Sequence, residues 1–257
     1  MNTNPAPTPP PPWWETFYDE NLADMLLEQT SAAEIRSAAD FLIQQLHLRP
    51  GATVLDQCCG SGRLAWELAL RGYAMRGMDL IPAYIERARR RESTVENAPR
   101  FEVADAFVFK ADPPCDAVFN WWTSFGYSDA DETNQLMLRR AWESLRSGGF
   151  YALDFMNVPG LYRHFLPHVV TRNGEVTLIR ESTLDLPANV IRKQWTYFLP
   201  DGRRVVHDSA VRLYDPAALR RLFEGAGFTD VTFFGDVDAS PLTLKSPRCI
   251  VRARKPL

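Results

Sequence analysis

The spacing of apolar residues predicts one long helix before residue 52 and, after it, short strands that alternate with helices. Before that point, Ser31 and Glu34 form a capping box, and the helix that they begin is expected to end at Arg49–Pro50–Gly51. Beyond it, the apolar runs expected as strands are 52–56, 73–79, 101–103, 116–120 and 150–155. Helices are expected at 63–71, 82–91 and 131–146. This alternation predicts a mostly parallel sheet with helices on both faces.

The alternation stops after residue 160. Residues 176–182, 190–199 and 204–214 read as three strands without helices between them, which predicts an antiparallel insertion over the main sheet. A helix capped by Asp215 and Pro216 follows, and the last two apolar runs predict an antiparallel hairpin. We therefore expect one domain made of residues 13–160 and 215–257, with residues 161–214 inserted as a lid or a dimer contact.

The N-terminus differs in composition from the rest of the chain. Residues 1–12 contain six of the 19 prolines and no apolar run, so we expect an extended, disordered tail and not a signal peptide. Four aromatic residues follow within residues 13–18. Two interpretations stay open for them: a segment that packs on the domain, or a lid over a small-molecule pocket.

Composition and charge exclude several classes of protein. The 257 residues are 46% hydrophobic and 24% charged with a net charge of −3, which is typical of a globular protein and disfavours a nucleic-acid partner. Four cysteines lack the spacing of a zinc site or a disulfide framework, and Pro167 separates His164 from His168, so we expect no metal. No apolar stretch is long enough to span a bilayer. These features predict a cytoplasmic protein, monomeric or homodimeric, with no membrane partner.

Candidate chemistry lies where the first strand meets the first helix of the alternating region. Gly60–Ser61–Gly62 allows a ligand to approach the backbone and the helix N-terminus. Asp79 ends the next strand 19 residues after Gly60, close to the spacing of about 20 expected for a carboxylate that binds a ribose. The glycine run also satisfies a dinucleotide fingerprint, which leaves an NAD(P)-dependent oxidoreductase open. Asp56, however, would repel a pyrophosphate and suits a cationic ligand.

Six motifs in order resemble those of the class I S-adenosylmethionine-dependent methyltransferases, over residues 14–255. Residues 54–63 resemble the first motif, and Asp79 matches the acidic residue after the second strand. The later motifs are matched by residues 104–106, 115–127, 145–150 and 214–228. The resemblance implies a Rossmann-like, seven-stranded, mostly parallel sheet that ends in an antiparallel hairpin. It also implies S-adenosyl-L-methionine as the cofactor.

The resemblance assigns cofactor contacts to particular positions. Those implied for the methionine part are Asp56 and the turn that contains Gln57, Cys58, Gly60 and Gly62, with Arg63 on the carboxylate. Those implied for the ribose and adenine are Asp79, Leu80, Asp105 and Ala106, while Asn120 and Trp121 lie near the sulfonium. Gln57 departs from the family pattern, in which an apolar residue is commoner.

The acceptor is less well defined by the sequence. Asn120–Trp121–Trp122–Thr123 stands where methyltransferases of nucleic-acid amines carry N/D-P-P-Y/F, so we expect a small-molecule acceptor methylated on oxygen or nitrogen. The candidate catalytic residues are His207 and Tyr127, and the candidate acceptor-binding residues are Trp14, Tyr18, Trp122 and Asn157. A non-catalytic protein that binds S-adenosylmethionine remains an alternative.

Overall fold

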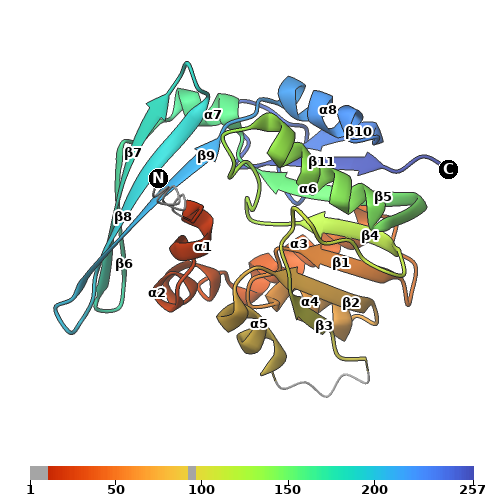
Figure 1. Cartoon of the computed structure of the whole chain (residues 1–257), viewed down its shortest axis with the longest axis horizontal. Helices are drawn as coiled ribbons and strands as arrows, with labels where there is room; N and C mark the ends of the chain where they lie inside the picture. The colour runs from red at the N-terminus through yellow and green to blue at the C-terminus, as the bar shows by residue number, and fades with distance from the viewer. Residues whose placement is uncertain (1–10, 92–96) are drawn as a thin grey trace, which may run out of the picture.

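A computed structural model describes residues 11–91 and 97–257, which form two β-sheets with a helical segment between them (Figure 1). Most of the tail expected at residues 1–12 lies outside the described residues. Sheet A, on the right of Figure 1, has helices on both faces, and sheet B stands on the left. No helix in the described residues is long and apolar enough to cross a bilayer.

Sheet A has seven strands in the order β10-β11-β5-β4-β1-β2-β3. Their bounds are β1 Thr53–Gln57, β2 Ala74–Asp79, β3 Arg100–Val103, β4 Cys115–Asn120, β5 Leu145–Phe155, β10 Thr229–Phe234 and β11 Cys249–Arg254. Five neighbouring strands of this order, β5, β4, β1, β2 and β3, run parallel to one another. β11 is antiparallel to both β5 and β10. The predicted Rossmann-like sheet with its terminal hairpin is therefore confirmed. β5 begins earlier than the expected Phe150, because Leu145 already pairs with Cys115 of β4.

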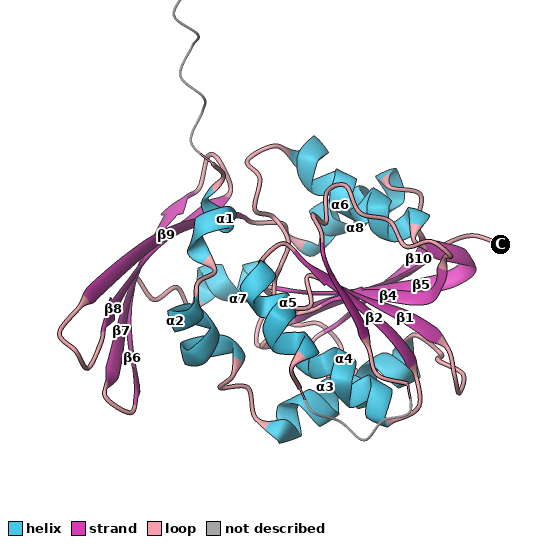
Figure 2. Cartoon of the chain, turned by 60° about the horizontal axis from the view of Figure 1, so that its bottom comes forward, coloured by secondary structure: helices cyan, strands magenta, loops and turns pink. Residues whose placement is uncertain are grey.

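Alternate residues of the buried strands face opposite layers of helices (Figure 2). Val54 of β1 belongs to the core under α3 Ala32–Gln45, α4 Arg63–Leu70 and α5 Pro82–Arg89, whereas Leu55 belongs to the core under α6 Asp131–Glu143 and α8 Pro216–Gly225. A strand that is buried on both faces reads as a continuous apolar run, which is why the sequence identifies it. The capping box of Ser31 and Glu34 begins α3 as predicted.

Sheet B is antiparallel throughout and has four strands, one more than the sequence predicted. They are β6 His168–Asn173, β7 Val176–Asp185, β8 Val190–Phe198 and β9 Arg204–Arg212. The missed strand, β6, is an edge strand with no fully buried residue, so its sequence carries no apolar alternation. Helix α7 Val158–Arg163 connects sheet A to this sheet.

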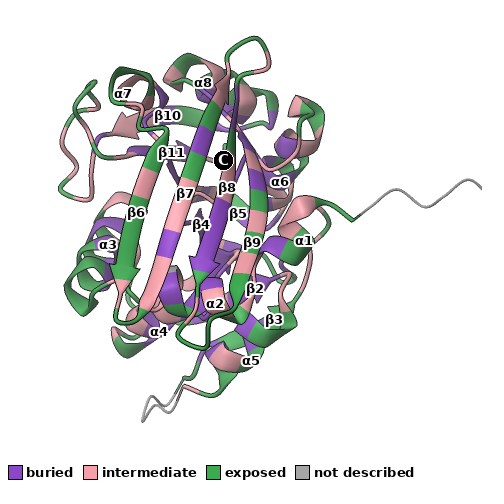
Figure 3. Cartoon of the chain, turned by 90° about the vertical axis from the view of Figure 1, so that its left-hand side faces the viewer, coloured by how far each residue is buried: buried purple, intermediate pink, exposed green. Residues whose placement is uncertain are grey.

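The N-terminal segment fills the space between the two sheets. It consists of α1 Trp13–Phe17, α2 Glu20–Leu22 and a π-helical turn, η1 Ala23–Leu27 (Figures 1 and 2). Phe17 and Leu22 form a small separate core with Leu178, Trp195 and Tyr197 of sheet B. Sheet B, seen face-on in Figure 3, is attached to the main domain through this segment and also directly, because Ile191 and Val211 belong to the core under α6 and α8.

Candidate functional site

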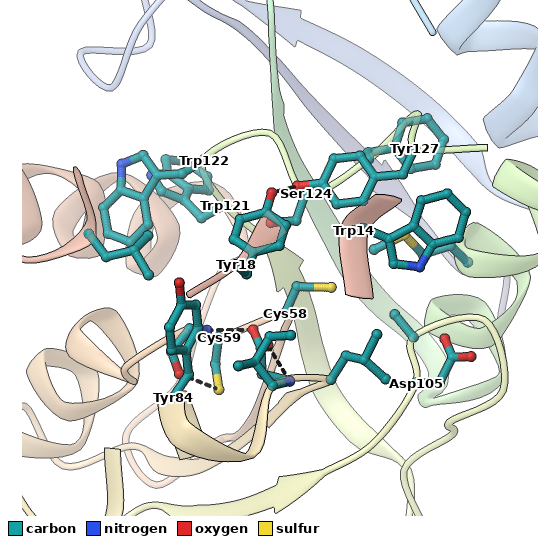
Figure 4. A pocket seen from close by; sticks show the side chains of 18 of the residues that line it. Trp14, Tyr18, Cys58, Cys59, Tyr84, Asp105, Trp121, Trp122, Ser124 and Tyr127 are labelled. Atoms are coloured by element: carbon teal, nitrogen blue, oxygen red, sulfur yellow. Dashed lines mark hydrogen bonds between the residues drawn. The ribbon is translucent and has the colours of Figure 1, made fainter. Parts of the chain in front are cut away.

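The candidate site lies beyond the carboxyl ends of the parallel strands of sheet A, where open α/β sheets bind their ligands. It is a pocket of about 970 Å³, part of which is open to solvent. Asp79 ends β2, and the loop after β1 and the loop after β3 complete the floor. The walls come from the loop after β4, from the first turn of α5 and from the N-terminal segment (Figure 4).

The turn between β1 and α4 is held by Asp79. The Gly60 N–H donates to Asp79 Oδ2 at 2.8 Å, and the Ile81 N–H donates to Oδ1 at 3.0 Å. Each oxygen of a carboxylate has two lone pairs, so both can still accept a hydrogen bond from a ligand hydroxyl. Gly62 has a φ of 72°, and a Cβ there would lie 2.6 Å from the ring of Phe101. The turn therefore requires glycine at this position.

Cys58 occupies the same turn with a φ of 63°, in the left-handed region that residues with a Cβ rarely adopt. Its thiol lines the pocket (Figure 4). Burial raises the pKa of this thiol well above its usual value, and the nearby Asp79 and Asp56 add to the effect. Cys58 therefore stays a neutral thiol.

Carboxylates without a cationic partner give the floor its electrostatic character. Burial raises the pKa of Asp56 well above its usual value, and the nearby Asp79 adds to it. Burial also raises the pKa of Asp79, although three backbone N–H groups act in the opposite direction. Within the described part of the chain, Asp56, Asp79 and Asp105 form no ion pair. Such a floor suits a ligand that brings positive charge and hydroxyl donors.

Two buried polar atoms at the end of β4 have no hydrogen-bond partner among the described residues. The Asn120 side chain donates through Nδ2 to the Ser124 carbonyl at 3.2 Å, but its Oδ1 has no partner. The indole N–H of Trp121, which lines the pocket, has none either. Buried polar groups are nearly always paired in native proteins, so the unpaired indole N–H of Trp121 marks a place where a ligand could bind.

Aromatic residues from distant parts of the chain form the wall opposite this floor. Tyr18 and Tyr127 form a hydrogen bond through their hydroxyls, and Trp14 lies beside them (Figure 4). Trp13 donates from its indole to the Tyr127 carbonyl at 3.2 Å. Burial is the largest cause that raises the pKa of both tyrosines, which therefore stay protonated at neutral pH. The N-terminal segment both packs on the domain and closes the pocket, so its two interpretations hold together.

The pocket brings together most of the predicted site residues. Those that line it are Trp14, Tyr18, Cys58, Gly60, Arg63, Asp79, Leu80, Asp105, Ala106, Trp121, Trp122 and Tyr127. Four others are buried outside the lining: Asp56, Gln57, Gly62 and Asn120. Gln57 donates to the Met137 carbonyl at 3.2 Å and accepts from the Tyr151 hydroxyl at 3.0 Å. These bonds explain how a polar residue is accommodated in the core at that position.

Arg63 lines the pocket but is already engaged. Its guanidinium donates to the Leu27 carbonyl at 2.6 Å and to the Thr30 carbonyl. It therefore fastens the N-terminal segment to the first turn of α4. The contact with a cofactor carboxylate that the resemblance implies would require the same guanidinium to serve both purposes.

Asn157 and His207 lie apart from the pocket lining. Asn157 donates from Nδ2 to the carbonyls of Thr243 and Ser246, both at 2.8 Å, and it caps α7. His207 Nε2 lies 2.9 Å from Asp19 Oδ2, where it ties β9 to the N-terminal segment. In this conformation neither side chain faces the space where a ligand would react.

Sequence reasoning missed several residues that line the pocket, of which Tyr84 and Ser124 contribute polar groups. Tyr84 stands in the first turn of α5, and its hydroxyl donates to the Asp19 carbonyl at 2.8 Å. The signal that could have identified it is its place directly after the strand that ends at Asp79. Ser124 lies within a motif already noted, and nothing in the sequence singles out its side chain.

Comparison with known proteins gives consistent matches. Residues 54–149 match the family described as a methyltransferase domain. Over 163 residues the chain is 26% identical to the ubiquinone/menaquinone biosynthesis C-methyltransferase UbiE of Zymomonas mobilis, which covers 60% of this chain and 65% of that protein. The match thus spans slightly less than two thirds of that relative.

Two solved structures share the whole fold at low sequence identity. The CcbJ methyltransferase from Streptomyces caelestis superimposes with a TM-score of 0.81 at 20% identity, over 95% of this chain and 99% of that one. An amino pentose methyltransferase from Micromonospora echinaspora, solved with S-adenosylmethionine bound, has a TM-score of 0.67 at 18% identity, over 93% and 98% of the two chains. Both extend the similarity of fold well beyond residues 54–149.

Proposed function

Because this chain carries a class I S-adenosylmethionine-dependent methyltransferase domain, we propose that it transfers the cofactor's methyl group to a nitrogen or oxygen atom of a small molecule. The observation that carries the proposal is the pocket itself, which joins an acidic floor to an aromatic wall. We also infer that residues 13–160 and 215–257 form the catalytic domain, with residues 161–214 as its insertion.

The residues present fit the cofactor. Asp79 has free lone pairs for the ribose hydroxyls, and Asp105 with the Ala106 backbone lies where the adenine edge is expected. The methionine part would lie along the turn after β1, near the buried carboxylate of Asp56. When bound, S-adenosylmethionine supplies a methyl group already activated by its sulfonium. The positive charge of the sulfonium and the amino group would offset the unpaired carboxylates of the floor.

The aromatic wall supports a small acceptor. Trp14, Tyr18 and Tyr127 cover the part of the pocket that faces away from the sheet (Figure 4). Sheet B stands behind the N-terminal segment, so the acceptor reacts in an enclosed space. Enclosure excludes water and holds the reacting atoms in line, and methyl transfer depends mainly on such positioning. The amino pentose methyltransferase that shares this fold supports an acceptor of sugar size.

The titratable side chains around the pocket favour a nitrogen atom as the methyl acceptor. Attack by a neutral amine needs no base in the transition state, whereas a hydroxyl needs one. Tyr18 and Tyr127 are held protonated by burial, and no histidine lines the pocket within the described residues. We assign Tyr127 the task of orienting the acceptor through its hydroxyl. His207 then acts as a positioning residue that holds Asp19 and the N-terminal segment.

The test begins with the cofactor. We expect calorimetric titration to show micromolar binding of S-adenosylhomocysteine, and Asp79→Ala to weaken it at least about tenfold, because two charge-assisted hydrogen bonds are lost. Asp129→Ala removes an exposed carboxylate outside the pocket and serves as the matched control. Binding of NADH with no binding of S-adenosylhomocysteine would instead favour the oxidoreductase.

The second step identifies the reaction. The protein is incubated with S-adenosylmethionine carrying a labelled methyl group and a panel of amino sugars, other amines and hydroxyl-bearing metabolites. Transfer to an amine is the expected result. Cofactor binding without transfer to any member of the panel would favour the non-catalytic alternative.

A further inference from the structure

Sheet B presents two cations to the interior of the molecule. The register of β7, β8 and β9 places Ser182, Lys193 and Ser209 side by side in one row across the sheet. The next row on the same face consists of Arg180, Trp195 and His207. Trp195 packs against Phe17 of the N-terminal segment, so this face of the sheet is turned inward. Together with Trp13, the first row lines a hollow at the edge of the segment, which we call the cationic hollow.

Both cations lie close to the Trp195 ring. The guanidinium carbon of Arg180 is 5.2 Å from the ring centroid, and Lys193 Nζ is 6.0 Å from it. Burial lowers the pKa of both groups, and the neighbouring Arg180 lowers that of Lys193 further, to about 8. Two like charges are therefore held in a partly desolvated place.

Neither cation has an acidic partner among the described residues, unlike its neighbours on the same sheet. Arg192 pairs with Asp185, and Arg212 pairs with Asp131. Asp19, which reaches this face from the N-terminal segment, is bonded to His207. Glu181 and Asp208 also border the hollow, but strand alternation turns their side chains to the opposite face. There Glu181 lies near His168, and Asp208 accepts from Gln194. An uncompensated pair of half-buried cations is unfavourable by itself, so its presence points to a negatively charged ligand.

Hydroxyl groups add neutral donors beside the two charges. Tyr197 lies two residues beyond Trp195 on the same face of β8, is fully buried, and its hydroxyl has no hydrogen-bond partner among the described residues. Ser209 Oγ accepts from the Trp195 indole at 3.0 Å, which leaves its own hydrogen available. Ser182 is buried in the same row.

The cationic hollow is separated from the methyl-transfer pocket by a pair of aromatic rings. Trp13 lines the hollow, and Tyr127 lines the pocket. Their ring centroids are 4.8 Å apart. A small molecule that reaches past these two rings would place its nucleophilic atom in the pocket and another group in the hollow.

We propose that the cationic hollow binds a phosphate or diphosphate group of the acceptor, so that the substrate of this enzyme is a phosphorylated small molecule. The inference rests on the proposed methyl transfer and specifies its substrate class. A phosphate carries more charge and more acceptor oxygens than a carboxylate, and thus matches two cations together with several hydroxyl donors.

The experiment measures anion binding without requiring activity. Inorganic pyrophosphate is titrated calorimetrically into the full chain saturated with S-adenosylhomocysteine. We expect binding to the wild type, and a loss of affinity of about tenfold or more in Lys193→Gln and in Arg180→Gln. Arg172→Gln removes an exposed cation of β6 that does not line the hollow, and it should change affinity less than twofold.

Other outcomes overturn the proposal. They are no pyrophosphate binding by the wild type, equal binding by the Lys193 variant, or succinate binding as tightly as pyrophosphate. Thermal unfolding tests whether the variant is folded, since Lys193→Gln removes a half-buried cation without an acidic partner and should melt no lower than the wild type. Because S-adenosylhomocysteine binding is measured in the same samples, failure of the anion site is distinguishable from failure of the methyltransferase.

Discussion

The hydroxyl of Tyr18 is hydrogen-bonded to that of Tyr127, which lies 109 residues away in the sequence. This contact joins the N-terminal segment to the loop that follows β4. It closes the pocket over the acidic floor, and burial keeps both phenols protonated. The enclosed reaction space thus depends on a bond between two parts of the chain that meet only in the folded protein.

Removal of one of these hydroxyls tests its role in orienting the acceptor. Tyr127→Phe keeps the ring and the wall but removes the hydrogen bonds of the hydroxyl with Tyr18 and with the Thr123 carbonyl. We therefore expect kcat/KM for the acceptor to fall about tenfold, equivalent to about 1.4 kcal/mol. Affinity for S-adenosylhomocysteine should be nearly unchanged. Steady-state kinetics with the identified acceptor measures the first quantity, and calorimetry the second. An unaltered kcat/KM would remove Tyr127 from the mechanism.

His207 is expected to act through Asp19 and not as a base. His207→Gln keeps a hydrogen-bonding side chain beside Asp19, so we expect kcat to change by no more than a few fold while the acceptor KM rises. The pH profile of kcat should keep its shape. A collapse of kcat in the variant, with a changed shape of its pH profile, would show that His207 moves a proton in the reaction.

Cys58 carries a conformational cost that glycine would relieve. Because its φ is 63°, we expect Cys58→Gly to raise the free energy of unfolding by up to about 1 kcal/mol, the size of a left-handed penalty less the entropy of glycine. Cys58→Ala keeps the Cβ and is the control that should show no gain. Urea denaturation compares the three proteins. Equal stability of the glycine and alanine variants would contradict the prediction.

Pyrophosphate binding should depend on pH through Lys193. Its pKa of about 8 in the unliganded protein means that the ammonium is lost as the pH rises through that value, so affinity should decline above it. The other groups that face Lys193 do not produce this change. Arg180 stays charged at these pH values, and Tyr197 has its pKa raised by burial.

The matched variant separates this titration from that of the ligand. In Lys193→Gln the affinity for pyrophosphate should be weaker at pH 7 and should show no decline between pH 7 and 9. Calorimetric titrations at several pH values measure both proteins. A parallel decline in the wild type and the variant would assign the pH dependence to another group.

Much of the fold was predictable, because the spacing of apolar residues along the chain and the helix-capping residues indicate where the strands and helices lie. Strands buried on both faces read as apolar runs, and the helices between them carry their own caps, as Ser31 and Asp215 show. Parallel strands place their carboxyl ends at one edge of the sheet, and the motifs that resemble those of the methyltransferases implied one site there for Asp79 and Asp105. The edge strand β6 was not predicted, because it buries too few side chains to show an alternation of apolar and polar residues.

The sequence by itself determined the alternating sheet and the glycine turn, since each depends on neighbours a few positions apart, and its motifs implied by resemblance which residues meet the cofactor. The tertiary structure decided which distant residues lie next to one another around the pocket and the cationic hollow. Only strand register aligns Lys193 with Ser182 and Ser209, and only the packed N-terminal segment brings Tyr18 to Tyr127 and Asp19 to His207. Such contacts join residues far apart in the chain, and their geometry follows from packing that no local spacing encodes.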